Sequence, residues 1–137
     1  MNTLTTLKQN ILKASILVLI SISCLVSNAS DFTVKPVAFT AVINNANMNK
    51  VDLKWSTETE TNLSHFIVER SIDGVNFSNA ALVFAYGNTT SRSEYVFADN
   101  INKIKSGNIH YRITSVDSDG RGQVSEIIII HTDNIKQ

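Results

Sequence analysis

The sequence predicts an all-β protein, folded as a two-sheet antiparallel β-sandwich of about seven strands. From about residue 36 onward, apolar residues recur with a period of two rather than 3.6. Turn-forming dipeptides and polar stretches separate these segments roughly every ten residues. No segment carries a helical repeat of useful length, so we expect strands and turns throughout this part of the chain.

The first 29 of the 137 residues form a separate element, a predicted signal peptide. Lys8 and Lys13 precede the apolar run Ala14–Val26, which is shorter than the ~20 residues of a membrane-spanning helix. Ser27 and Ala29 supply the small side chains that a cleavage site needs, so we expect cleavage after Ala29. The protein is therefore predicted to be exported, to the periplasm or the extracellular space, with no transmembrane segment after cleavage.

Residues 30–137 then form one predicted domain. The chain has 12 basic and 12 acidic residues, and because Lys8 and Lys13 leave with the signal, the domain is mildly acidic. This balance gives no field suited to nucleic acid. Cys24, the only cysteine, also leaves, so the domain has no disulfide and depends on its core. A lipid anchor on Cys24 is the alternative, but Ser21 stands where bacterial lipoproteins carry a large aliphatic residue.

The first strand candidate, Pro36–Ile43, begins at the only proline, a residue that edge strands tolerate. The polar loop Asn44–Asn47 leads to the clearest strand, Val51–Ser56. Its predicted core face carries Val51, Leu53 and Trp55, and its predicted solvent face carries Asp52, Lys54 and Ser56. Thr57–Asn62 is a predicted polar connection to the next strand.

The later strands follow the same alternation. His65–Arg70 is predicted to point Phe66 and Val68 inward, and Asp73-Gly74 and Asp119-Gly120 are predicted hairpin turns because glycine accepts a positive φ. The other candidates are Ala80–Tyr86, Glu94–Phe97, His110–Thr114 and Val124–His131. Their predicted inward residues include Tyr95, Phe97, Tyr111 and Ile113. Gly87–Ser91 is a predicted polar loop.

Four consecutive isoleucines, Ile127–Ile130, interrupt the alternation. Either both faces of this strand should be covered or the strand should lie beside a partner, because an exposed flat edge of such composition would aggregate. We expect it to pair within the chain's own sheet rather than with a second molecule, and we expect a monomer.

Three stretches carry a resemblance to a family. They are Val51–Asn62, Phe66–Phe77 and Tyr111–Ile113 followed by Val116–Gly120. Together they resemble the fibronectin type III-like modules of secreted Bacteroidetes proteins, over essentially the whole mature chain. Trp55 falls in the second strand, as in fibronectin type III domains, whereas immunoglobulin domains have a cysteine pair and a tryptophan on the third strand.

Such a resemblance usually implies a spacer attached to another domain. For this chain we expect an exported, non-catalytic interaction module that binds a protein or a glycan, with no cofactor. Because such modules often belong to larger chains, a structural accessory or remnant of a larger secreted enzyme or adhesin is the alternative. Exposed polar loops on a rigid sandwich are where such folds carry recognition. The candidate contact residues are Asn88, Thr89, Ser91, Arg92 and Arg121.

The stretch from Glu69 to Gly74 is interpreted as a structural corner. Arg70 shares the inward parity of Phe66 and Val68, so its guanidinium needs a buried partner, for which Glu60 and Asp99 are the candidates. Glu69 is expected to face solvent. The residues predicted to have structural roles are Trp55, Arg70, Asp73, Gly74, Tyr111, Asp119 and Gly120.

No metal site is expected. Ser115–Glu126 matches several places of an EF-hand calcium loop, but Ser115 stands where that loop needs an aspartate and its flanks are strand-like. A weak surface calcium site in this loop stays open as an alternative. His65, His110 and His131 lack the spacing of a helical zinc site, and the first two are expected on outward positions.

An enzyme is not expected, because no nucleophile motif or phosphate loop is present. Glu58 and Glu60 are two apart and could face the same way, as a glycosidase pair would. This is the sequence's one basis for a hydrolase hypothesis.

Overall fold

The computed structural model describes residues 33–104 and 107–132. The chain divides into two compact units, residues 1–30 and 31–137, and every described residue belongs to the second, called unit 2 below. The predicted signal peptide, with Cys24, lies outside the described residues. Within the described part of the chain, no helix is long and apolar enough to span a membrane.

Unit 2 is all-β, with eight strands and no helix among the residues that the structure describes. The strands are β1 (Thr33–Ile43), β2 (Lys50–Thr61), β3 (Leu63–Ser71), β4 (Ser78–Phe84), β5 (Ser93–Asn100), β6 (Asn108–Asp117), β7 (Gly122–Val124) and β8 (Ile128–His131). Each of the seven predicted strands is present. The eighth arises because the predicted strand Val124–His131 is split.

The split lies at Ser125. Its Oγ accepts a hydrogen bond from the backbone N–H of Ile113 at 2.9 Å, and its own N–H donates to the Ile113 carbonyl at 2.8 Å. The serine side chain thus takes the place of a backbone carbonyl in the ladder, and β7 ends before β8 begins. No pattern of apolar residues marks this interruption.

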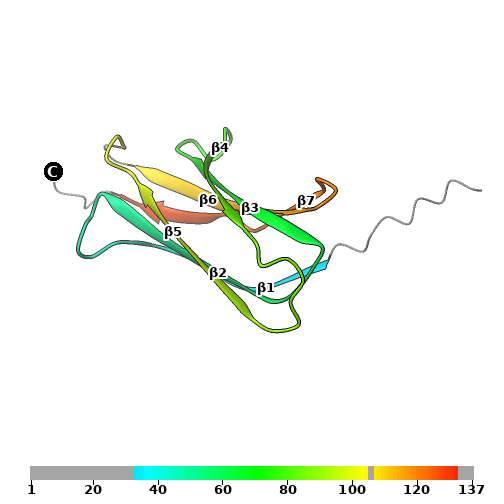
Figure 1. Ribbon diagram of the computed structural model, residues 1–137. Coiled ribbons are helices and arrows are strands. Elements are labelled where there is room, and N and C mark those ends of the chain that lie inside the picture. The colour runs from blue at the N-terminus through cyan, green and yellow to red at the C-terminus, as the bar shows by residue number, and fades with distance from the viewer. Residues whose placement is uncertain (1–32, 105–106, 133–137) are drawn as a thin grey trace, which may run out of the picture. The chain divides into compact units, whose positions relative to one another are not determined.

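The strands form two antiparallel sheets (Figure 1). Sheet A has the order β1-β2-β5. Sheet B has the order β4-β3-β6-β7, and β8 also pairs with β6. The two-sheet antiparallel arrangement agrees with the predicted β-sandwich.

The prediction that Thr57–Asn62 is a polar connection is wrong, because β2 continues to Thr61. Two register shifts occur here against β1, where Thr57 pairs with Pro36 but Glu60 pairs with Val34. Three residues of β2 therefore oppose two of β1, and the extra residue reverses the alternation, so Glu60 turns into the interior. The strand then ends at Asn62, which has a φ of 57°.

The core joins the two sheets. The Trp55 ring on β2 meets Phe66 on β3 edge-on at 5.5 Å and stacks on Tyr95 of β5 at 5.6 Å between centroids. Val51, Leu53 and Trp55 are buried as predicted, and so is Tyr111. Ser56 is buried as well, which corrects its predicted place on the solvent face.

The isoleucine run is paired within the chain's own sheet, as predicted, because β8 pairs with β6 from Tyr111↔Ile128 to Asn108↔His131. Of the two predicted alternatives, pairing with a partner strand applies, and the two faces are not both covered. Ile128 and Ile130 pack against the core, whereas Ile127 and Ile129 are each 47% exposed.

Candidate functional site

Two of the predicted contact residues, Asn88 and Thr89, instead hold a corner of the fold. The Asn88 side-chain oxygen accepts a hydrogen bond from the backbone N–H of Asn62 at 2.6 Å. Thr89 exchanges two backbone hydrogen bonds with Glu60, at 2.9 and 3.0 Å. Because Asn62 has a positive φ, these contacts stabilise a backbone turn that asparagine tolerates better than most residues.

The other two residues of this loop, Ser91 and Arg92, are exposed. Arg92 pairs loosely with Glu94 at 3.3 Å, and both side chains are more than half exposed. Arg92, Glu94 and Lys54 border a shallow hollow of about 200 Å³ on the outer face of sheet A. Its lining combines three charged side chains with apolar ones, whereas small-molecule sites are usually lined mainly by apolar residues.

Arg121, the fifth predicted contact residue, belongs to the turn between β6 and β7. Its Nε donates to the buried carboxylate of Asp117 at 2.6 Å, and its Nη2 lies 3.4 Å from Asp119. Burial raises the pKa of Asp117, but the hydrogen bonds from the Arg121 backbone and guanidinium outweigh this, so the pKa lies below its usual value. Arg121 therefore closes its own turn, in which Gly120 supplies a φ of 83°.

The structure brings these loops to one end of unit 2, at the right in Figure 1. Asn62 connects them, because its N–H binds Asn88 and its carbonyl accepts from the N–H of Ser118 at 3.1 Å. The predicted contact residues thus gather at one end, but most of their polar atoms are used internally.

The hydrogen bonds of Asp117 also argue against a calcium site in the loop Ser115–Glu126, because they occupy a carboxylate that would bind the ion. Asp117 occupies the loop's third place, and its oxygens accept from the N–H groups of Asp119 and Arg121 and from the Arg121 guanidinium. Among the described residues, no group of three or more acidic, histidine or cysteine side chains is placed to hold a metal ion.

Arg70 pairs with Asp99, one of its two predicted partners. Its Nη1 lies 2.9 and 2.7 Å from the two carboxylate oxygens, and the Tyr111 hydroxyl donates to the same carboxylate at 2.6 Å. Burial and this acceptor raise the pKa of Tyr111 well above its usual value. The three side chains join β3, β5 and β6, so they fix the two sheets to each other.

Glu60, the other predicted partner of Arg70, has a different role. Its Oε1 accepts hydrogen bonds from the hydroxyls of Thr57 at 2.6 Å and Tyr95 at 2.7 Å. Its Oε2 is buried with no hydrogen-bond partner in the described part of the chain. Glu58 is exposed, so the prediction that the two carboxylates face the same way is wrong.

Glu69 does not lie free in solvent, which corrects its predicted state. It accepts two hydrogen bonds from the Arg112 guanidinium, at 3.0 and 2.9 Å, and one from the Thr114 hydroxyl at 2.8 Å. The Arg112 hydrogen bond is the main reason that the pKa of Glu69 lies below its usual value. The Phe77 ring covers the Arg112 guanidinium at 4.0 Å.

The Asp73-Gly74 corner is built as a turn. The Asp73 carboxylate accepts from the side chain of Asn76 and from two backbone N–H groups, which holds its pKa far below its usual value. Gly74 has a φ of 75° and lies against His110, since a Cβ there would be 3.1 Å from the imidazole Nε2. His110 is therefore half-buried rather than a free surface residue, and so is His65, while His131 is exposed.

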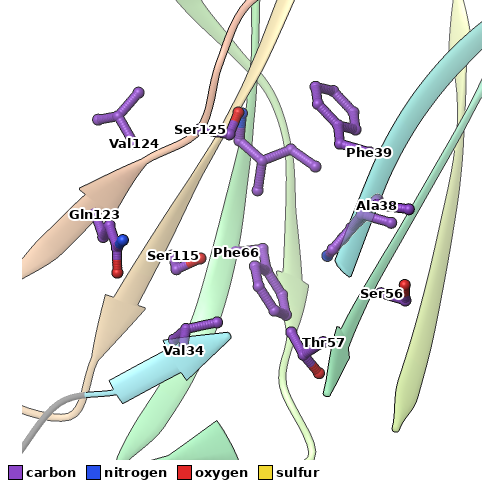
Figure 2. A pocket seen from close by; sticks show the side chains of 12 residues that line it. Val34, Ala38, Phe39, Ser56, Thr57, Phe66, Ser115, Gln123, Val124 and Ser125 are labelled. Atoms are coloured by element: carbon purple, nitrogen blue, oxygen red, sulfur yellow. The ribbon is translucent and has the colours of Figure 1, made fainter. Parts of the chain in front are cut away.

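A pocket that the sequence did not predict lies between the edges of the two sheets. Figure 2 shows Gln123 and Val124 on β7 at the left, Ala38 on β1 at the right and Phe66 between them, with Val34 of β1 lower in the view. Its volume is about 60 Å³. Since a cavity of about 150 Å³ accommodates benzene, this pocket suits a branched aliphatic group or a few waters.

Two of the residues that line the pocket have a buried polar group without a partner. The Trp55 indole N–H and the Ser56 hydroxyl are both buried, and neither has a hydrogen-bond partner within the described residues. Leaving such a group unpaired costs about 1–3 kcal/mol. Both residues line this pocket, and both also line the hollow on the outer face of sheet A.

The pocket follows from the irregular pairing of β1. The register shifts on either side of Pro36 move this strand out of a regular ladder with β2. The sequence predicted Pro36 at the start of this strand, whereas it lies inside β1, so the proline was the signal in the sequence for such irregularity.

No protein-family model and no curated protein sequence matches this chain. Among solved structures, the chain is similar to a β-1,2-glucanase from Parabacteroides distasonis, with a TM-score of 0.55 and 17% sequence identity. The match covers 80% of this chain but 14% of the glucanase chain. At this identity the likeness shows the fold alone, and this chain spans only a small part of that enzyme.

Proposed function

We propose that unit 2 is a fibronectin type III-like interaction module, exported and non-catalytic, which binds a protein or a glycan through the pocket between β1 and β7. The observation that carries the proposal is the pocket itself, with its apolar wall and the two unpaired polar groups of Trp55 and Ser56. A mostly apolar pocket with a few converging polar groups is the usual form of a binding site.

The strand order supports the fibronectin type III-like assignment. In constant-type immunoglobulin domains, the fourth strand joins the sheet of the first, second and fifth strands. Here β4 pairs with β3 in the other sheet. The tryptophan on the second strand and the absence of a cysteine pair from residues 30–137 point the same way.

The arrangement of the carboxylates supports a non-catalytic role. Glu58 is exposed, whereas the Glu60 Oε1 is held by two hydroxyls inside the fold. The two therefore share no space in which a substrate would lie between them. Replacing Glu58 by Gln is expected to leave ligand binding unchanged, whereas a hydrolase would lose its activity.

Crosslinked capture from envelope fractions tests the binding site. We expect a protein captured by the wild type to be lost with Ser115→Leu, which fills the pocket from β6, and with Val124→Glu, which charges its rim. Asn102→Leu adds an equal apolar side chain to an exposed loop and should leave capture unchanged. Binding to β-1,2-glucan and other envelope glycans, measured with the same variants, covers the glycan case. Equal capture by all four proteins would place the binding site elsewhere.

The second candidate is a structural accessory or remnant of a larger secreted enzyme. The similarity to one part of a β-1,2-glucanase favours it, because there a similar fold occurs within a much longer chain. This candidate expects the protein to co-purify in equal amounts with a larger secreted enzyme and to raise that enzyme's melting temperature. Filling the pocket with Ser115→Leu should then leave the binding of any soluble ligand unchanged.

Export is part of the proposal. The amino-terminal sequence of the protein purified from the native cell is expected to begin at Ser30. A lipidated Cys24 at the amino terminus would instead establish membrane anchoring, and an intact Met1 would contradict export.

A further inference from the structure

Unit 2 has four sheet edges among its described residues, and three of them carry features that oppose pairing with another strand. Register shifts surround Pro36 in β1, β5 contains the charged Glu94, and the edge beyond β6 is divided into the short strands β7 and β8, of three and four residues. Bulges, prolines, charges and short lengths are the usual means of protecting an edge. The fourth edge is β4.

β4 lacks this protection. The segment from Ser78 to Tyr86 contains neither a charged residue nor a proline. Its outer face is apolar, with Leu82 53% and Phe84 77% exposed. An uncharged apolar edge of this kind favours pairing with a further strand.

The direction of the free backbone groups follows from the pairing with β3. His65 lies opposite Phe84, and the Ala85 N–H donates to the Ser64 carbonyl at 3.0 Å. Hydrogen-bonded and non-hydrogen-bonded pairs alternate in an antiparallel ladder, so His65 and Phe84 are a non-hydrogen-bonded pair. The backbone N–H and C=O groups of the next residue, Val83, therefore point toward β3. The N–H and C=O groups of Leu82 and Phe84 therefore point toward the open edge.

One irregularity limits how a new strand could pair. Opposite Val68 and Glu69, β4 has an extra residue at Ala80, because Val68 pairs with Ala81 and Glu69 with Asn79. The regular part of the open edge thus begins at Ala81, and its centre is Val83.

We propose that this edge pairs with the same edge of a second copy of the chain, antiparallel about a two-fold axis at Val83. In this register Leu82 lies opposite Phe84 of the second copy, and Phe84 opposite its Leu82. Four hydrogen bonds then join the two backbones, and two leucine–phenylalanine contacts form on the outer face. The proposal is independent of the pocket, and it differs from the monomer that the sequence predicts.

Charge is the reason for choosing a second copy as the occupant. A strand that pairs with itself about a two-fold axis brings its own residues together, so any cluster of like charges would repel. β4 has none, whereas self-pairing of β5 could bring its two acidic residues, Glu94 and Asp99, toward those of the copy. The chain thus contains a strand that suits this edge, namely β4 itself.

Sedimentation of the protein, purified after expression of the full-length chain, tests the proposal from low to high micromolar concentration. We expect a monomer–dimer equilibrium. The double variant Leu82→Lys with Phe84→Lys places like charges opposite each other and should weaken dimerisation by about tenfold or more.

The charge-swapped variant Leu82→Lys with Phe84→Glu separates this register from a general loss of apolar surface. It places lysine opposite glutamate of the second copy at both positions, so dimerisation should recover relative to the double lysine variant. Val96→Lys changes an equally exposed residue on the outer face of sheet A and should have no effect. A monomer at every concentration, or equal dimerisation by the two double variants, would overturn the proposal.

Discussion

Replacing Arg70 by methionine should unfold the protein more easily than the same change at Arg92. The Arg70 guanidinium binds the Asp99 carboxylate, and these side chains are 28% and 8% exposed. Methionine retains most of the apolar stem but cannot bind the carboxylate. Among the described residues, Asp99 then keeps one side-chain hydrogen bond, from the neutral Tyr111 hydroxyl. The variant therefore has a buried carboxylate without a counterion.

The magnitude follows from burial. Removing one partner of a fully buried ion pair costs about 3–5 kcal/mol. Because solvent reaches part of Arg70, we reduce this to about 2–3 kcal/mol. For a domain of this size, the loss corresponds to a fall in melting temperature on the order of 10 °C or more.

Arg92→Met is the matched control. The Arg92 and Glu94 side chains are 56% and 73% exposed, so this pair should contribute less than about 1 kcal/mol. Urea unfolding followed by the single tryptophan measures both variants. Adding Asp99→Asn to Arg70→Met removes the unpaired charge and should recover part of the loss. Equal stability of the two arginine variants would refute the reasoning.

Three further predictions concern pH and the turns. The pKa values of Glu69 and Asp117 lie below the usual 4.5 and 3.8, so their contribution to stability is complete above those values and is lost as the pH falls through the lowered ones. The urea midpoint should therefore be flat just above pH 5 and decline below about pH 4.5, and a midpoint that rose on acidification would contradict this. Gly120→Ala forces a positive φ of 83° on alanine and should lower the free energy of unfolding by about 1–2 kcal/mol, although the added Cβ would meet open space. Chemical denaturation that showed no loss of stability would argue against this turn. Asn88→Ala removes the acceptor for the Asn62 N–H and should cost about 1 kcal/mol in the same assay, whereas unchanged stability would return Asn88 to the candidates for ligand contact.

Local pattern was sufficient to predict much of the fold. The alternation of Val51, Leu53 and Trp55 identified the buried face of β2. The parity of Arg70 predicted a carboxylate partner, and Asp99 was one of its two candidates. Both inferences depend only on the period of two in an extended strand. They hold wherever the ladder is regular.

The errors lie where the ladder is irregular or where a partner is distant in sequence. Glu60 turns inward because of an extra residue in β2, which a period of two cannot reveal. Glu69 is bound by Arg112, 43 positions later, and only the pairing of β3 with β6 brings them together. The pocket combines both causes, since it needs the shifted β1 and the distant β7.

The polar loops show a further limit of composition. Asn88 and Arg121 were predicted as contact residues because polar loops on a sandwich often bind ligands. The same side chains also suit the closing of turns. Here Asn88 accepts from the backbone N–H of Asn62, and the Arg121 guanidinium donates to Asp117 within its own turn. Residue type alone does not separate these two roles.

The fluorescence of Trp55 tests the central claim most directly, because the only tryptophan lines the proposed binding pocket. The captured protein, or the glycan that binds, is titrated into the wild type and the emission spectrum is recorded. We expect a saturable change in emission that is absent in Ser115→Leu and retained in Asn102→Leu. Binding that leaves the Trp55 emission unchanged in the wild type would contradict the assignment of the pocket as the binding site.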